Sequence, residues 1–214
     1  MAFSLETVTL KTKTGIKPKN AIILCHGYEG NGKNIALLAN YWRGFLPHTI
    51  FMCPNAPYKC KKKNTFMWFN PNENDQKSLK RVIKSVEVLN KFLDEVKNEY
   101  NLQDENLIIG GFSQGCMITL KAGIRRKKKV KLIIGYSGKI IDKKYLDLNL
   151  NSKPNICLFH GDQDKIVKPD YLYEAKKFLK SRKFNVKAKM FKKCDHKISR
   201  EGANLGLNFI KNFF

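Results

Sequence analysis

The sequence predicts an α/β fold in which helices cover both faces of a mostly parallel central sheet. Short, continuously apolar segments, typical of buried parallel strands, alternate along the chain with segments whose apolar residues recur every three or four positions, typical of amphipathic helices. The 214 residues, 43% of them hydrophobic, can bury the core of one good-sized domain, and no Gly/Ser/Pro-rich linker divides them. We therefore expect a single α/β domain over residues 1–214.

The first part of the chain supplies three expected strands. Residues 5–10 alternate apolar and polar side chains, which indicates a half-exposed edge strand. Residues 21–25 are continuously apolar and lead into the turn-rich residues 26–32, as a buried parallel strand followed by a loop would. The next helix is expected to contain the apolar residues Ile35, Leu37, Leu38 and Trp42. Residues 49–53 form the third strand, which Pro54 ends.

The remaining elements follow a long stretch, about residues 54–76, that we expect to be irregular. Loops of this length inside a compact domain are usually functional or mobile. After it comes the clearest amphipathic helix, residues 79–96. Further strands are expected at residues 107–111, 131–136, 155–160 and 186–191, and further helices at residues 113–124 and 169–179. A closing helix from about Ser199 has an apolar face of Ala203, Leu207, Ile210 and Phe214.

The net charge of +23 raises the alternative of a protein that binds nucleic acid or an anionic membrane, notably through residues 59–63 and 125–129. However, 35 of the 41 basic residues are lysine and are spread along the chain, as in proteins of AT-rich genomes. A nucleic-acid reader is expected to use more arginine and to interleave aromatic residues with its charges. We interpret the runs as solvated faces, and expect no specific nucleic-acid partner and at most peripheral contact with an anionic membrane.

The sequence carries no sign of secretion, membrane insertion or metal binding. Residues 1–6 lack the features of a signal peptide, and no apolar run approaches the roughly 18 residues that span a bilayer. The six cysteines form no C-x-x-C pair, and most sit beside apolar residues, as small buried hydrophobes do. We expect a cytoplasmic protein with neither a disulfide framework nor a zinc site.

A candidate nucleophile follows the strand expected at residues 107–111. Gly111-Phe112-Ser113-Gln114-Gly115 is a G-x-S-x-G sequence between a buried strand and a helix. The glycines permit a tight, strained turn from which Ser113 projects at the edge of the sheet. Because so short a pattern also occurs by chance, the chain must supply a base, an acid and an oxyanion hole as well.

Histidine is the expected base, because a serine hydroxyl is protonated at neutral pH and must lose its proton as it attacks. Of the four histidines, His196 lies between the last strand and the last helix, where the base falls in the order Ser, acid, His. His26 and His160 each precede a glycine at a strand end and are expected to be structural. His48 precedes a strand and has no acidic partner nearby in the sequence.

The acid and the oxyanion hole also have candidates. Asp164 and Asp162 both follow the next-to-last strand, and Asp164 is favoured because an aspartate in a tight turn, such as Asp162, more often bonds its own backbone. Asp195 adjoins the base, but its side chain is expected to point away from the ring. Two backbone N–H groups can complete the oxyanion hole: that of Gln114, after the nucleophile, and that of Tyr28, in the loop after an early strand.

Six ordered motifs resemble the phospholipase/carboxylesterase family of α/β-hydrolases, which includes acyl-protein thioesterases. The motifs are His26-Gly27, Trp68-Phe69, Gly111-Phe112-Ser113-Gln114-Gly115, Tyr136-Ser137-Gly138, His160-Gly161-x-x-Asp164-x-Ile166-Val167 and His196-x-Ile198-Ser199, and the resemblance runs over residues 21–209. The resemblance implies an α/β-hydrolase fold, a triad of Ser113, Asp164 and His196, and hydrolysis of carboxylic esters or thioesters without a cofactor. It also implies that Trp68 and Phe69 border the acyl site, although ordinary core packing is the other interpretation of these aromatic residues.

Two residues depart from the family pattern at positions where glycine is common. Glu29 follows the first oxyanion donor and would oppose catalysis unless its carboxylate points to solvent. Cys116, just after the nucleophile turn, is expected only to fill space in the first turn of the helix.

The leading hypothesis is a serine hydrolase of small carboxylic esters, with thioesters or lysophospholipids as further candidate substrates, acting as a monomer or homodimer. The alternative is a basic binding protein on a hydrolase scaffold, although a binding module has no need of an ordered triad. A third hypothesis is a related hydrolase that cleaves a dienelactone or a peptide bond.

Overall fold

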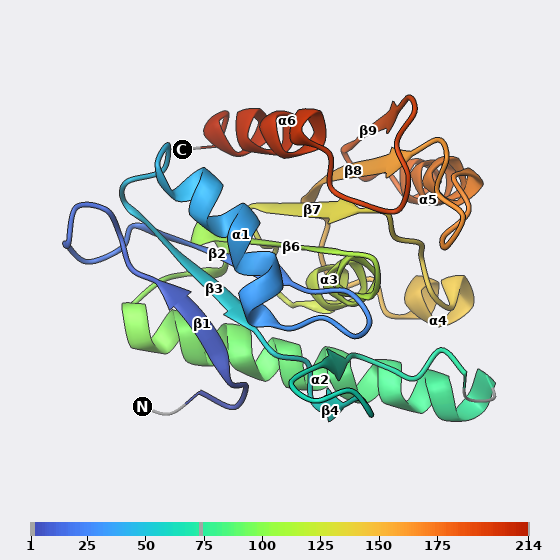
Figure 1. Ribbon diagram of the computed structural model, residues 1–214, viewed down its shortest axis with the longest axis horizontal. Helices are drawn as coiled ribbons and strands as arrows, with labels where there is room; N and C mark the ends of the chain where they lie inside the picture. Colours follow the sequence, from blue (N-terminus) through green and yellow to red (C-terminus); the bar gives the residue numbers. More distant parts are fainter. Residues whose placement is uncertain (1–2, 73–74, 214) are drawn as a thin grey trace.

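The computed structural model describes residues 3–72 and 75–213. Its centre is a seven-stranded sheet (Figure 1). The strand order is β1-β3-β2-β6-β7-β8-β9. β1 runs antiparallel to β3, and every other neighbouring pair is parallel. The strands are β1 (Thr7–Leu10), β2 (Asn20–Cys25), β3 (Thr49–Pro54), β6 (Leu107–Phe112), β7 (Leu132–Tyr136), β8 (Asn155–Gly161) and β9 (Val186–Phe191).

Helices cover both faces of this sheet, as predicted (Figure 1). One face carries α1 (Gly32–Arg43) and α6 (Arg200–Lys211). The other carries α2 (Asp75–Tyr100), α3 (Gln114–Arg125), α4 (Lys143–Leu148) and α5 (Asp170–Ser181). Each face has its own apolar core, because neighbouring residues of the buried strands point alternately to the two sides. No helix among the described residues is both long and apolar enough to cross a membrane.

The structure differs from the predicted elements where the sequence pattern is weak. The stretch expected to be irregular contains a two-stranded antiparallel hairpin of β4 (Tyr58–Lys59) and β5 (Phe66–Met67). A 3₁₀ turn (Asp104–Asn106) and the six-residue α4 were not predicted, because both are too short to show helical periodicity. In the closing helix, Ala203, Leu207 and Ile210 are buried as expected, whereas Phe214 lies outside the described residues.

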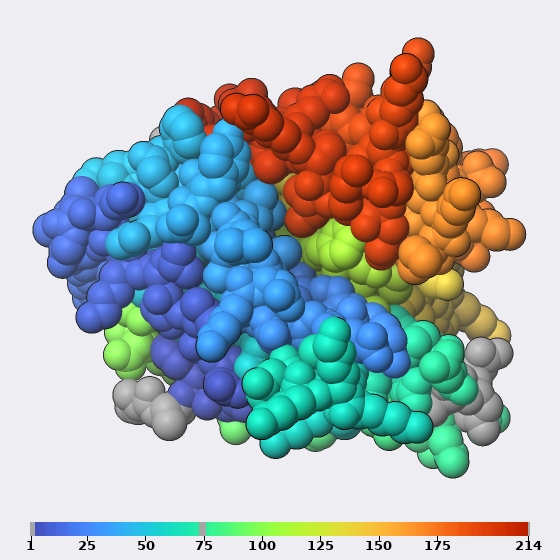
Figure 2. Space-filling view, viewed as in Figure 1, coloured from blue at the N-terminus to red at the C-terminus, as the bar shows by residue number. Residues whose placement is uncertain are grey.

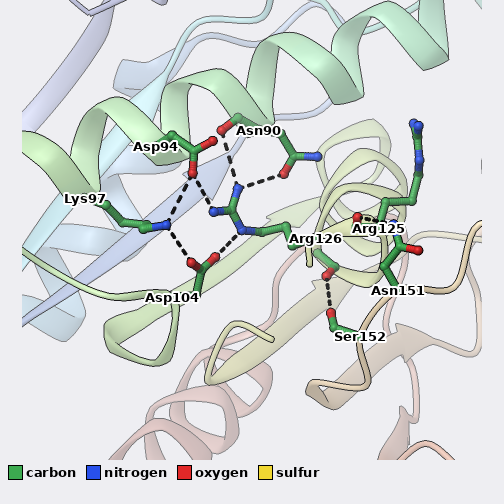
Figure 3. Close-up of polar contacts among 9 residues, drawn as sticks. Asn90, Asp94, Lys97, Asp104, Arg125, Arg126, Asn151 and Ser152 are labelled. Carbon is green, nitrogen blue, oxygen red and sulfur yellow. Dashed lines mark hydrogen bonds and ion pairs between the residues drawn. The ribbon is translucent and has the colours of Figure 1, made fainter. Parts of the chain in front are cut away.

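Two side chains have an exposure that their sequence patterns did not indicate. Leu37, one of the apolar residues that suggested this helix, is 76% exposed, because α1 turns Ile35, Ala39 and Trp42 toward the sheet. Arg126 belongs to a basic run interpreted as a solvated face, yet it is buried and bonds acidic and amide groups at the end of α3 (Figure 3). The interpretation holds for residues 127–129, which are exposed.

Candidate active site

Four loops meet at the carboxyl edge of the sheet. β2, β6, β8 and β9 all run in the same direction, so the residues that follow them lie along one edge (Figure 1). These residues are His26, Ser113, Asp164 and His196. In sheets of this kind ligands bind at the carboxyl ends of the strands, which makes this edge the expected site.

Ser113 occupies a strained turn between β6 and α3. Its backbone has φ 53° and ψ −115°, a sparsely populated conformation for a residue with a side chain, and its N–H donates to Tyr136 O at 2.9 Å. The flanking glycines are required by close approach: a Cβ at Gly111 would lie 2.6 Å from Cys25 O, and one at Gly115 only 2.1 Å from it. The sequence therefore builds this turn locally, as the G-x-S-x-G pattern predicts.

His196 joins Ser113 to Asp164. Its Nε2 lies 3.1 Å from Ser113 Oγ, and its Nδ1 lies 2.7 Å from Asp164 Oδ2. Because a carboxylate only accepts, Nδ1 carries the proton in this arrangement and Nε2 is left to accept from the serine hydroxyl. This is the geometry in which an imidazole can deprotonate an attacking serine.

The Asp164 carboxylate is fully buried and held by several donors. Its Oδ1 accepts from the N–H groups of Ile166 and Val167 at 2.9 and 2.8 Å. Burial alone would raise the pKa of Asp164, but the hydrogen bonds from His196 and from these N–H groups bring it below its ordinary value. Asp164 therefore stays negatively charged next to the histidine.

The sequence did not indicate that a second histidine would bind Asp164. His160 Nε2 lies 2.8 Å from Val167 O and 3.1 Å from Asp164 Oδ2, inside the protein. His160 thus contacts the acid rather than the nucleophile. The only signal available was its position four residues before Asp164.

The remaining polar candidates lie outside this chain of hydrogen bonds. Asp162 accepts from the backbone N–H of Cys194 at 3.3 Å, and the exposed Asp195 pairs with Lys197 at 2.8 Å. His48 immediately precedes β3, so it lies at the amino end of that strand and away from the site.

His26 shapes the loop predicted to supply an oxyanion donor. Its Nε2 accepts from Ala56 N–H at 3.0 Å, so its Nδ1 carries the proton and donates to Gly27 O at 2.7 Å. Burial lowers the pKa of His26 to about 4, which keeps the ring neutral near neutral pH.

The loop that His26 holds lies against the nucleophile. A Cβ at Gly27 would lie only 3.3 Å from Ser113 Cβ, so the backbone just before Tyr28 lies close to the serine. Gln114 is the first residue of α3, and N–H groups in the first turn of a helix have no intrahelical acceptor. Both predicted oxyanion donors therefore belong to segments next to Ser113.

Comparison with known proteins shows the family of the chain. A family model described as phospholipase/carboxylesterase matches residues 11–214. The chain belongs to this family. Acyl-protein thioesterase 1 of Kluyveromyces lactis is 33% identical over 174 residues, covering 75% of this chain and 76% of that protein. The Saccharomyces cerevisiae protein of the same name is 31% identical over 186 residues, covering 79% and 81%.

Solved structures extend the likeness to the whole fold. The crystal structure of esterase PE8 superimposes with a TM-score of 0.93 and 28% identity, over 98% of this chain and 99% of that one. The protein is therefore an enzyme of the hydrolase class with an α/β-hydrolase fold, which confirms the fold, the family and the enzyme class that the sequence predicted.

The two departures from the family pattern have structural explanations. Glu29 adopts φ 53°, a left-handed conformation that glycine adopts without strain, and its side chain is exposed to solvent. Cys116 is buried beside Gly135 and Gly138, where an added Cβ would lie only 2.3 and 2.4 Å from its Sγ. Cys116 therefore fills space, as predicted, and needs both glycines opposite it.

Trp68 and Phe69, which the family resemblance puts at the acyl site, are buried next to the loop that begins at His26. Trp68 Nε1 donates to His26 O at 3.0 Å, and Trp68 N–H donates to Gln114 Oε1 at 3.1 Å. Gln114 Nε2 in turn donates to Phe69 O at 2.9 Å. These bonds tie both segments predicted to supply oxyanion donors to Trp68 and Phe69, which the sequence did not reveal. Contact of Trp68 and Phe69 with an acyl group stays a prediction.

A cleft of about 620 Å³ opens beside His196, between α1 and the segment that leads into α6. Figure 2 shows it as the hollow between the blue surface of α1 and its preceding loop and the red surface of the last residues. Its size is typical of a site for a small organic ligand. Among the described residues, no cluster of three or more His, Cys, Asp or Glu side chains could hold a metal ion.

Proposed function

We propose that the protein hydrolyses carboxylic esters or thioesters, with Ser113 as nucleophile, His196 as general base and Asp164 as the acid that orients it. The observation that carries the proposal is the pair of hydrogen bonds made by His196, at 3.1 Å to Ser113 Oγ and 2.7 Å to Asp164 Oδ2. The named thioesterase relatives support acyl thioesters as one substrate class.

In the first half of the reaction, Ser113 Oγ attacks the carbonyl carbon of the substrate while its proton passes to His196 Nε2. The carbonyl oxygen becomes an oxyanion, for which the N–H groups of Tyr28 and Gln114 are the proposed donors. As the C–O or C–S bond breaks, His196 returns the proton to the departing alcohol or thiol, and the acyl group remains esterified to Ser113.

In the second half, His196 takes a proton from water, and the resulting hydroxide attacks the acyl-enzyme carbonyl. Collapse of this intermediate releases the carboxylic acid, and Ser113 regains its proton from His196. Glu29 is exposed, so solvent screens the effect of its negative charge on the oxyanion. Every step is served by groups of this chain and by water.

Covalent labelling tests the proposal directly. A fluorophosphonate probe should label the protein, and Ser113→Ala should abolish labelling and lower kcat on p-nitrophenyl acetate by about 10⁶-fold. Ser181→Ala changes an exposed serine on α5 and serves as the matched control that keeps both properties. Undiminished labelling of Ser113→Ala would refute the proposed nucleophile.

A further inference from the structure

The cleft beside His196 has an apolar lining that the proposed chemistry does not use. Ile35 and Leu38 of α1 lie on one side, and Ile198 and Ala203 lie on the other, with Phe112 also in the lining. Because apolar surface of this kind gains free energy when water leaves it, the cleft is suited to a hydrocarbon ligand.

α1 presents more apolar surface to this cleft than its own packing requires. Leu37 and Tyr41, which line it, are 76% and 41% exposed, and Tyr28 from the oxyanion loop is 40% exposed. Single exposed apolar residues need no explanation, but three on the rim of one cleft mark a binding surface. A hydrophobic ligand in the cleft would cover Leu37.

The cleft borders the proposed reacting centre at His196 and at the loop of residues 26–30. Its lining includes His196, whose Nε2 lies 3.1 Å from Ser113 Oγ, and continues through residues 197–200. Of the described residues from Ser113 to Asp195, none lines the cleft. The cleft therefore lies between His196 and residues 26–30, and not beside the loops that follow β7 and β8.

The position of the cleft beside His196 decides which half of the substrate enters it. His196 Nε2 must deliver its proton to the departing oxygen or sulfur, so the leaving group lies on the histidine side of the carbonyl carbon. The acyl chain then extends from the other side. We infer that the cleft between α1 and residues 196–203 binds a hydrophobic leaving group, so that the enzyme selects esters or thioesters by the alcohol or thiol they release. This inference rests on the proposed function.

Two matched ester series test the inference. One keeps the acetyl group and lengthens the alcohol from ethyl to octyl, and the other keeps ethanol and lengthens the acyl group over the same range. We expect kcat/KM to rise along the alcohol series by up to about fourfold per carbon, since burying one CH₂ contributes about 0.8 kcal/mol, and to change less along the acyl series.

A charge in the cleft should remove this selectivity. Leu37→Asp should bring the octyl-to-ethyl ratio of kcat/KM close to one. Leu148→Asp is the matched control, because Leu148 of α4 is 78% exposed but lies outside the cleft, and it should keep the wild-type ratio. Thermal unfolding of both variants checks that they are folded.

The outcomes separate the two proposals. A wild-type protein that is not labelled by the fluorophosphonate and hydrolyses neither series contradicts the proposed function. A labelled, active enzyme whose rate rises only along the acyl series places the acyl chain in the cleft and overturns the inference about the leaving group. Equal ratios for Leu37→Asp and Leu148→Asp overturn it as well.

Discussion

Two buried aspartates, Asp104 and Asp164, lie at opposite ends of the sheet and belong to networks of different kinds. Asp104 precedes β6 and Asp164 follows the parallel strand β8, and each is 4% exposed. Asp104 bonds Arg126 and, at 2.6 Å, Lys97 Nζ (Figure 3). Burial would raise the pKa of both carboxyls, yet their hydrogen bonds hold each pKa below its ordinary value.

The partners of the two carboxylates explain why one network is structural and the other is suited to chemistry. Lys97 and Arg126 bring fixed positive charge to Asp104, and Arg126 also bonds Asp94 at 2.6 Å, so these charges are neutralised in the resting protein. Asp164 is held by backbone N–H groups and imidazoles instead. In the proposed mechanism, its negative charge is therefore available to stabilise the imidazolium that would form when Ser113 attacks.

The largest effect is expected when the carboxylate of Asp164 is replaced. Asp164→Asn should lower kcat by about 10⁴-fold, because an amide favours the wrong tautomer of His196. The measurement is turnover of p-nitrophenyl acetate, with thermal unfolding followed in parallel. A folded variant that loses less than tenfold in kcat would show that Asp164, like Asp104, has a structural role, and the two networks would not differ in kind.

The same substitution at Asp104 should lower the stability of the protein instead. Asp104→Asn removes a carboxylate shared by Arg126 and Lys97 and should lower the free energy of unfolding by about 3–5 kcal/mol, measured by urea denaturation. At 25 °C the kcat of the protein that remains folded should match the wild type. Asp147→Asn disrupts the exposed pair with Arg182 and is the control, for which little change in stability is expected. A large drop in kcat for Asp104→Asn would show that the networks are coupled.

The sequence predicted the surroundings of Asp164 far better than those of Asp104, because the former depend on short local patterns. The turn at Ser113, the strand-ending positions of Asp164 and His196, and the parallel strands that align them all follow from short local patterns. Arg126 was interpreted as part of a solvated run because its acidic partners come from positions 22 and 32 residues away. No local periodicity encodes such a pairing.

The hydrogen bonds of Trp68 to the segments beside Ser113 could not be predicted for the same reason. Trp68 and Gln114 are 46 residues apart in the sequence, and their hydrogen bond exists only once the chain has folded. The exposure of Leu37 likewise depends on how α1 rotates over the sheet, which helical spacing alone leaves open. Local patterns thus predicted which residues lie at the site, but not the contacts that position them.

A smaller effect on stability is expected on acidification, and it distinguishes the buried His26 from the two buried aspartates. His26 has a pKa of about 4 when folded and near 6.5 when unfolded, so the unfolded chain binds its proton first as the pH falls. His26 should thus contribute stability above pH 6.5 that is lost between pH 6.5 and 4, amounting to roughly 3 kcal/mol. The carboxyls, whose pKa values are lowered, lose their contribution only at lower pH, below their ordinary value of 3.8. Urea denaturation at successive pH values should therefore show a slope between pH 6.5 and 4 that His26→Gln removes, and an unchanged slope in that variant would assign the loss to other groups.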